Sequence, residues 1–117
     1  LSGTYEKALR TLHDLEEDLP SIAGAINRIE CRLEALASCG VDTNSLIFQA
    51  SYGRTSMEYY DGFVFGFYCA TGVGEPPVAT GGRYDALTRH LGNGVELPAV
   101  GGVIRPDLLI KAEGHCA

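Results

Sequence analysis

The spacing of apolar residues changes near residue 46, and this change constrains the fold more than any other feature of the sequence. Before it, apolar residues recur every three or four positions, which is the period of an amphipathic α-helix. After it, the period shortens to two, which is typical of β-strands. Helices followed mainly by strands predict an α+β fold with a largely antiparallel sheet.

The first forty residues predict two consecutive helices. Thr4 is a suitable N-cap for the first helix, and Pro20 ends that helix or restarts the chain direction. A second helix is expected from about Ser21, with Gly40 as its left-handed stop. Two helices with a short break predict either an αα-hairpin or one kinked helix.

The remainder of the chain predicts short strands and short helices. Aromatic and β-branched runs bounded by glycine and proline predict strands at 46–51, 59–71, 78–82 and 98–104. Helices are expected at 83–91 and from Pro106 to about Glu113. The glycine- and proline-rich stretch at 71–77 predicts a turn, so the second and third strands should form an antiparallel hairpin.

Composition narrows the classes of function. The chain has 117 residues and a net charge of −6, with 9 basic and 15 acidic side chains, which argues against nucleic-acid binding. No apolar run is long enough for a membrane span, and the N-terminus has neither a Met nor a signal pattern. We therefore expect a cytoplasmic protein, and a chain that is processed or is part of something longer.

No metal or cofactor site is expected. The four cysteines contain no Cys-x-x-Cys pair, so they are interpreted as thiols without a special role. His13 and the acidic run at 16–18 lie off the apolar stripe and are interpreted as a solvated face. No phosphate-loop or dinucleotide pattern is present, and no Ser-His or Cys-His pairing is evident, so no residue is assigned a catalytic role.

Two glycines in the strand predicted at 59–71 are the first candidate feature. Gly62 and Gly66 would share one face with Tyr60, Val64 and Tyr68. Glycines inside a strand suggest that something approaches the backbone closely, either a ligand or a packed helix. The opposite face would carry one acidic and three aromatic residues and is expected to face the core: Asp61, Phe63, Phe65 and Phe67.

The second feature is the segment Gly-Gly-Arg-Tyr-Asp at 81–85, at a predicted strand-to-helix junction. Glycines there let the chain turn and leave N–H groups at the helix N-terminus accessible. Asp85 in the first turn suits the helix dipole. A capped tight turn without a ligand explains the same residues equally well.

Together these segments resemble histidyl-tRNA synthetases. Residues 58–65, Glu-Tyr-Tyr-Asp-Gly-Phe-Val-Phe, resemble the first histidine motif of that family, and residues 81–87, Gly-Gly-Arg-Tyr-Asp-Ala-Leu, resemble the second. Leu-Gly at 91–92 and Pro-Ala-Val-Gly at 98–101 resemble the approach to its third class II motif. The match runs in order from about 46 to 109, and it implies part of a class II synthetase-like antiparallel sheet flanked by helices.

Departures from the motifs point to a paralogue. The synthetase has arginines at the positions held here by Thr55 and Leu108, and a glutamate at the position of Gly66. Leucine cannot offer charge to a phosphate. Keeping the tyrosines while losing both arginines resembles the regulatory subunits of short-form ATP phosphoribosyltransferase. That resemblance implies no aminoacylation activity, histidine as a ligand, a short catalytic subunit as partner, and a homodimer of the full-length chain.

The resemblance also implies a domain assignment and a set of binding residues. Residues 1–117 would be one fragment of a class II synthetase-like domain, with a helical segment at 1–40 and the sheet at 46–113. Histidine would be bound by two leading tyrosines, a third tyrosine that could instead pack in the core, and the Gly-Gly-Arg turn, in which Arg83 orients a carboxylate or braces the loop: Tyr60, Tyr84, Tyr59, Gly81, Gly82 and Arg83.

Two other interpretations stay open at this point. One is a piece of an active histidyl-tRNA synthetase, against which Thr55 and Leu108 argue. The other is a plain α+β binding module whose match to the motifs is coincidental, against which the order of the matched segments argues. The upstream sequence, with or without its own synthetase motifs, would discriminate between them.

Overall fold

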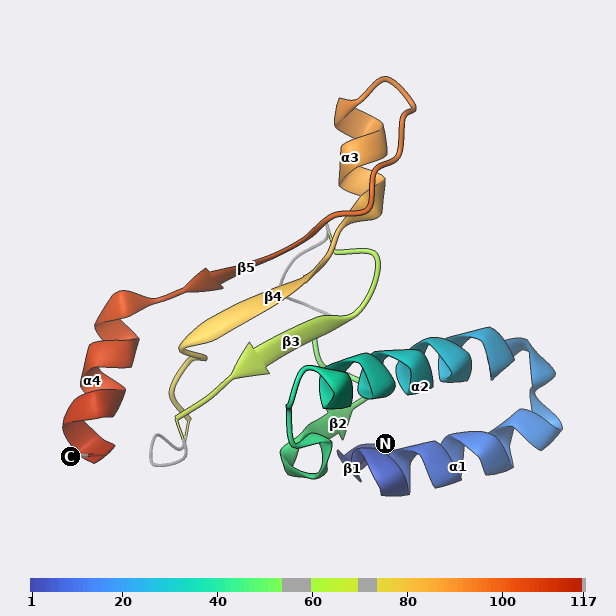
Figure 1. Cartoon of the computed structure of the whole chain (residues 1–117), viewed down its shortest axis with the longest axis horizontal. Helices are drawn as coiled ribbons and strands as arrows, with labels where there is room; N and C mark the ends of the chain where they lie inside the picture. The colour runs from blue at the N-terminus through green and yellow to red at the C-terminus, as the bar shows by residue number, and fades with distance from the viewer. Residues whose placement is uncertain (54–59, 70–73, 117) are drawn as a thin grey trace. The chain divides into compact units, whose positions relative to one another are not determined.

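The computed structural model describes residues 1–53, 60–69 and 74–116. The chain divides into two compact units, Leu1–Ser51 and Tyr52–Ala117, which we call the N-terminal and the C-terminal unit. Both contain helices and antiparallel strands, which confirms the predicted α+β fold class (Figure 1). The boundary lies close to the point where the period of apolar residues changes.

The N-terminal unit is a pair of helices closed by a short ribbon of two strands. Its elements are β1 (Ser2–Thr4), α1 (Tyr5–Asp18), the 3₁₀ turn η1 (Pro20–Ile22), α2 (Ala23–Ser38), the 3₁₀ turn η2 (Thr43–Ser45) and β2 (Ile47–Gln49). Thr4 caps α1 as predicted, because its hydroxyl accepts from the Lys7 N–H at 3.4 Å. Gly40 has the predicted left-handed conformation, with φ of 84°.

Strand β1 was not predicted from the sequence. It pairs with β2 in antiparallel register, with Gly3 opposite Phe48, and the Ala50 N–H donates to the Leu1 carbonyl at 3.0 Å. The ring of Phe48 meets that of Tyr5 edge-on, with centroids 5.5 Å apart. The ribbon therefore ties the start of α1 to the segment that follows α2.

The interior of the N-terminal unit is small. Ala8 of α1 and Ile26 of α2 are its buried apolar residues, with 1% and 2% of their surface exposed. Helix α1 carries its apolar residues on one side, so the two helices pack through a narrow contact. Polar side chains of α1 and α2 also contact each other at the edge of this apolar contact.

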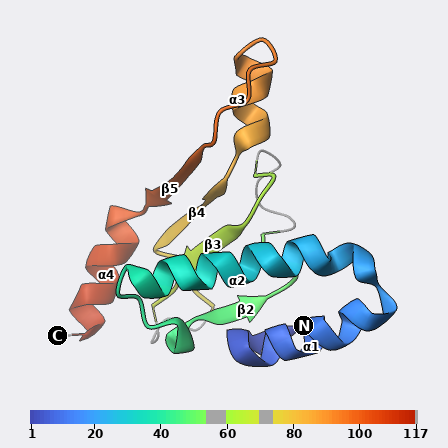
Figure 2. The same cartoon turned by 45° about the vertical axis from the view of Figure 1, so that its right-hand side comes forward.

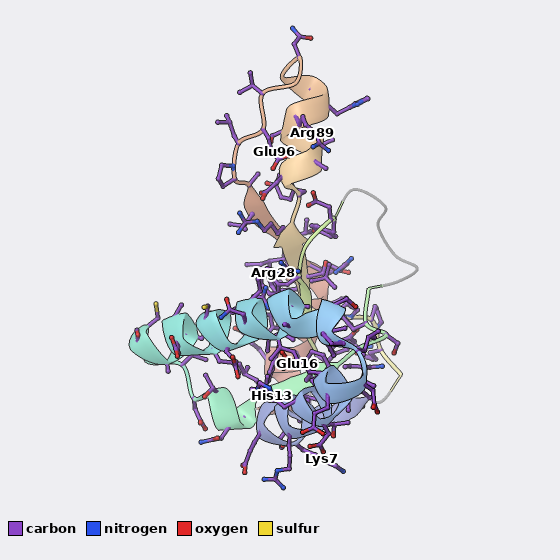
Figure 3. The ribbon with its side chains drawn as sticks, turned by 90° about the vertical axis from the view of Figure 1, so that its right-hand side faces the viewer. Lys7, His13, Glu16, Arg28, Arg89 and Glu96 are labelled. Atoms are coloured by element: carbon purple, nitrogen blue, oxygen red, sulfur yellow. The ribbon has the colours of Figure 1, made fainter. Side chains whose placement is uncertain are left out.

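One such contact is a histidine between two carboxylates. The Nε2 of His13 lies 2.8 Å from Oε1 of Glu30 on α2, and its Nδ1 lies 3.2 Å from Oε2 of Glu16 on α1. Figure 3 labels His13 and Glu16. The hydrogen bond to Glu30, followed by that to Glu16, raises the pKa of His13 above its ordinary value. Only the imidazolium can donate to both carboxylates, because neutral imidazole carries one N–H.

We expect this contact to make the stability of the N-terminal unit depend on pH. Since the pKa of His13 is higher in the folded protein, its contribution is complete below the ordinary pKa, about 6.5, and is lost as pH rises through the folded value. Thermal unfolding of the wild type and of His13→Gln should therefore differ more at pH 5.5 than at about pH 8.5. An equal difference at both pH values would contradict the role of the imidazolium, and Glu6→Gln on the same helix is a control for a general charge effect.

The C-terminal unit is built on a three-stranded antiparallel sheet. The strands β3 (Val64–Phe67), β4 (Ala79–Arg83) and β5 (Val100–Ile104) lie in the order β3-β4-β5. Helix α3 (Asp85–Leu91) follows β4, and α4 (Pro106–Cys116) follows β5. The two helices extend from opposite ends of the sheet, as both views show (Figures 1 and 2). The predicted hairpin between the second and third strands is confirmed as β3 and β4.

The strand predicted at 59–71 is shorter in the structure. Its regular part runs from Val64 to Phe67, and the positions 59, 70 and 71 lie outside the described residues. Before Val64, the amides of Asp61 and Gly62 both donate to the carbonyl of Arg83, at 3.1 and 3.4 Å. Two residues opposite one is the arrangement of a β-bulge, which interrupts the ladder and turns the chain. The expectation that Asp61 shares the regular strand face with the phenylalanines is therefore wrong.

The phenylalanine face is only partly a core. The rings of Phe63 and Phe65 stack with centroids 5.7 Å apart, and Phe67 continues the row at the same spacing. Phe65 lies over the glycine at position 81, but Phe67 keeps 58% of its surface exposed. The prediction of a core face is thus wrong at Phe67, because α3 and α4 lie beyond the ends of the sheet (Figure 2). Within the described ranges, no helix is long and apolar enough to cross a membrane.

Candidate ligand-binding site

Two tyrosines from separate segments meet on one face of the sheet. The ring centroids of Tyr60, which precedes the bulge, and Tyr84, which follows β4, lie 6.2 Å apart, with an angle of 51° between the ring planes. The predicted convergence of the two rings is confirmed. Both are half-buried, so each presents part of its ring to the surroundings.

A pair of glycines forms the surface under these rings. Gly82 of β4 lies opposite Gly101 of β5 in the sheet register. A methyl group on Gly82 would lie 2.8 Å from Cδ1 of Tyr60, and one on Gly101 would lie 2.8 Å from the hydroxyl of Tyr84. The two side chains can approach the sheet closely because neither glycine carries a side chain.

The glycines singled out in the sequence have a different role from the one expected. A methyl group on Gly62 would lie 2.9 Å from Cβ of Arg83, and one on Gly66 would overlap the hydroxyl of Tyr52. The groups that approach these two glycines are therefore side chains of the same unit. At Gly62 and Gly66 the close neighbours are the side chains of Arg83 and Tyr52, just as the side chains of Tyr60 and Tyr84 are the close neighbours of Gly82 and Gly101.

Hydrogen bonds fix the junction between β4 and α3. The Asp85 carboxylate accepts from the Ala99 N–H at 2.8 Å and from Nε of Arg83 at 2.7 Å. The Ala99 contact, followed by the Arg83 contact, lowers the pKa of Asp85, so this carboxylate stays charged. The Tyr84 N–H donates to the Ala99 carbonyl at 2.9 Å, and the Tyr84 hydroxyl donates to the Val100 carbonyl at 3.3 Å. Tyr84 is thus held through its backbone N–H and through its hydroxyl.

The N-terminus of α3 is less accessible than predicted. The Ala86 N–H donates to Oδ2 of Asp61 at 2.8 Å, and the Leu87 N–H donates to the Tyr84 carbonyl at 3.1 Å. Protein groups thus occupy the amides that were expected to be accessible to a ligand. The interpretation as a capped turn fits this helix end.

The Gly-Gly-Arg segment, expected at a strand-to-helix junction, forms the end of β4 and contributes to both faces of the sheet. Gly81 is buried, and a methyl group there would overlap the ring of Phe65 and lie 2.5 Å from the Gly101 carbonyl. By alternation, Gly81 and Arg83 share the phenylalanine face, whereas Gly82 lies under the tyrosines. Of the two roles left open for Arg83, the structure shows the brace, since its Nε is paired with Asp85.

Other residues singled out in the sequence lie elsewhere. Tyr59 and Thr55 fall outside the described residues. Leu108 lies in the first turn of α4 and is half-buried. Among the residues with a described position, no three His, Cys, Asp or Glu side chains come together as a metal site would require.

A second tyrosine pair was missed by sequence reasoning. The Tyr68 hydroxyl donates to that of Tyr52 at 3.3 Å, and their ring centroids lie 6.3 Å apart. Burial, followed by this hydrogen bond, raises the pKa of Tyr52 to about 12. The signal that could have found it is Gly66, since a glycine inside a strand requires a close neighbour.

The sequence of this chain is similar to those of known proteins. The family model for histidyl-tRNA synthetase matches residues 1–109. An ATP phosphoribosyltransferase regulatory subunit of Brucella anthropi is 36% identical over 113 residues, and that of Brucella ovis is 34% identical over the same length. In both cases the match covers 96% of this chain and 30% of the relative, so the chain spans less than a third of their length.

No solved structure matches the chain at a significant level. The family model nevertheless includes both segments that carry the tyrosine pair, and it continues through β5 into α4. It also includes the whole N-terminal unit, which lies outside the motifs quoted from the sequence. The chain therefore belongs to the histidyl-tRNA synthetase family, and within that family it resembles the ATP phosphoribosyltransferase regulatory subunits.

Proposed function

We propose that this chain is part of a regulatory subunit of short-form ATP phosphoribosyltransferase, which controls the first step of histidine biosynthesis and has no catalytic activity of its own. The names of its relatives support the regulatory role. The partner is the short catalytic subunit, and the full-length protein is a cytoplasmic homodimer. Histidine is the ligand through which the subunit senses the end product.

The observation that carries the ligand proposal is the convergence of Tyr60 and Tyr84 over two glycines. Histidine is a small zwitterion with a flat aromatic ring, so a site for it needs an aromatic wall and a few fixed polar groups. The two tyrosines supply the wall and two hydroxyl groups, of which that of Tyr84 already donates to Val100 and is left as an acceptor. Tyr59 is the third tyrosine that we propose binds histidine. Gly82 brings the backbone close, and Gly81 and Arg83 belong to the segment at the end of β4 that leads to Tyr84.

The alternative is a piece of an active histidyl-tRNA synthetase, favoured only by the description of the family model. We expect no histidine-dependent exchange between ATP and pyrophosphate in the protein that carries this sequence, because Thr55 and Leu108 replace the arginines of the synthetase. The assay is incorporation of labelled pyrophosphate into ATP, with a histidyl-tRNA synthetase as positive control. Exchange well above background would overturn the regulatory interpretation.

A direct test of the partner is co-elution. Mixed with a short-form ATP phosphoribosyltransferase catalytic subunit, the protein should co-elute on a sizing column and change the activity of that subunit or its inhibition by histidine. A histidyl-tRNA synthetase in place of the protein is the control, and it should elute separately. Separate peaks together with unchanged kinetics would contradict the proposed partner.

A further inference from the structure

One hydrogen bond joins the two segments that carry the tyrosine pair. Oδ2 of Asp61 accepts from the Ala86 N–H at 2.8 Å, across 25 residues of sequence. Tyr60 directly precedes Asp61, and Tyr84 lies two residues before Ala86. We infer that Asp61 is a positioning residue of the ligand site, holding Tyr60 against Gly82 at a fixed distance from Tyr84. This inference rests on the proposed function for its ligand, histidine.

The Ala86 N–H, in the first turn of α3, needs an acceptor that α3 itself does not supply. The first N–H groups of a helix have no partner within the helix and require a capping side chain or water. Tyr84 occupies the N-cap position without a side-chain cap, and the Asp85 carboxylate is bound to Ala99 and Arg83. Asp61 provides the missing acceptor from another segment, and its negative charge suits the N-terminus of the helix.

The backbone around Asp61 is also held by Arg83, whose N–H donates to the Phe63 carbonyl at 3.0 Å. The amides of Asp61 and Gly62 both donate to the carbonyl of Arg83, and the second distance is 3.4 Å. Asp61 is exposed, so burial of its side chain does not hold this segment in place. The carboxylate adds a side-chain contact between the segment that carries Tyr60 and the segment that carries Tyr84. We therefore expect the two rings to move relative to each other when this contact is removed.

The experiment follows the rings and the ligand separately. The protein is labelled with 3-fluorotyrosine, and the ¹⁹F signals of Tyr60 and Tyr84 are assigned from Phe variants. In Asp61→Ala we expect both signals to move and histidine affinity, measured by calorimetry, to fall about tenfold. In Asp61→Asn, which keeps an oxygen acceptor, we expect unmoved signals and an affinity within about twofold of wild type. Asp42→Ala is the matched control, because Asp42 caps η2 in the other unit through the Asn44 N–H.

The outcomes separate this inference from the proposed function. Unmoved ¹⁹F signals in Asp61→Ala would overturn the positioning role, whatever happens to histidine. Equal effects of Asp61→Ala and Asp61→Asn would overturn the role of the hydrogen bond. A wild type that binds no histidine, while Asp61→Ala still displaces the rings, would reject the ligand and support the positioning of the pair.

Discussion

Replacing Gly82 by alanine is expected to destabilise the C-terminal unit by about 1–3 kcal/mol, the usual cost of overpacking. The new methyl group would lie 2.8 Å from the Phe63 carbonyl and equally close to the Tyr60 ring. The Phe63 carbonyl cannot retreat freely, because it accepts the Arg83 N–H at 3.0 Å. The variant should therefore unfold at lower denaturant concentration and also displace Tyr60. Chemical unfolding monitored by circular dichroism measures the first effect.

The matched control is Gly114→Ala in α4. A methyl group on Gly114 would meet no atom within 4 Å, and alanine is favoured over glycine inside a helix by about 0.5–1 kcal/mol. We therefore expect opposite signs for the same chemical change at the two positions. Equal stability of the Gly82→Ala variant and the wild type would show that the tyrosine ring and the bulge do not lie as the structure has them.

Removing one hydroxyl from either tyrosine is expected to weaken histidine binding by about 1–3 kcal/mol, the cost of leaving a buried polar partner unsatisfied. This corresponds to a loss of about 5- to 150-fold in affinity. The variants are Tyr60→Phe and Tyr84→Phe, measured by calorimetry with histidine in the protein that carries this sequence. The Tyr84 hydroxyl already donates to the Val100 carbonyl, so towards a ligand it acts as an acceptor.

The free energy of unfolding is a second quantity that Tyr84→Phe is expected to change. Tyr84→Phe loses the bond to Val100 and should lower the free energy of unfolding by about 0.5–1.5 kcal/mol. Tyr5→Phe in the N-terminal unit is the control for the loss of a hydroxyl, since Tyr5 meets Phe48 through its ring. Unchanged histidine affinity in both Tyr60→Phe and Tyr84→Phe would end the proposal of a histidine site at this tyrosine pair.

The ends of helices could be predicted from the sequence because their signals are local. Thr4 offers a hydroxyl one residue before the apolar stripe of α1 begins, and Gly40 provides a left-handed residue shortly after α2 ends. β1 could not be predicted in this way, since Ser-Gly-Thr has no apolar alternation and becomes a strand only through its pairing with β2. The pairing of distant segments is a tertiary effect that single residues do not encode.

In the candidate site, too, local features could be predicted from the sequence, whereas contacts between distant segments could not. Alternation placed Tyr60 on the face of Val64, and both side chains lie beside Gly82 in the structure. Tyr84 was selected from the resemblance to the second histidine motif and not from alternation. Asp61 was misplaced because the bulge opposite Arg83 removes it from the strand. Its contact with Ala86 depends on how a separate helix begins, so the sequence around Asp61 contains no signal for it.

The ribbon of β1 and β2 also determines how the N-terminal unit can fold. Its hydrogen bonds join residues at the two extremes of the unit, with both helices in the loop between them. Helices form from local contacts within about a microsecond, whereas closing a long loop costs conformational entropy before its contacts are gained. The helices therefore form early and the ribbon closes last. In the native protein its strands open first, as expected for a pairing that few buried side chains support.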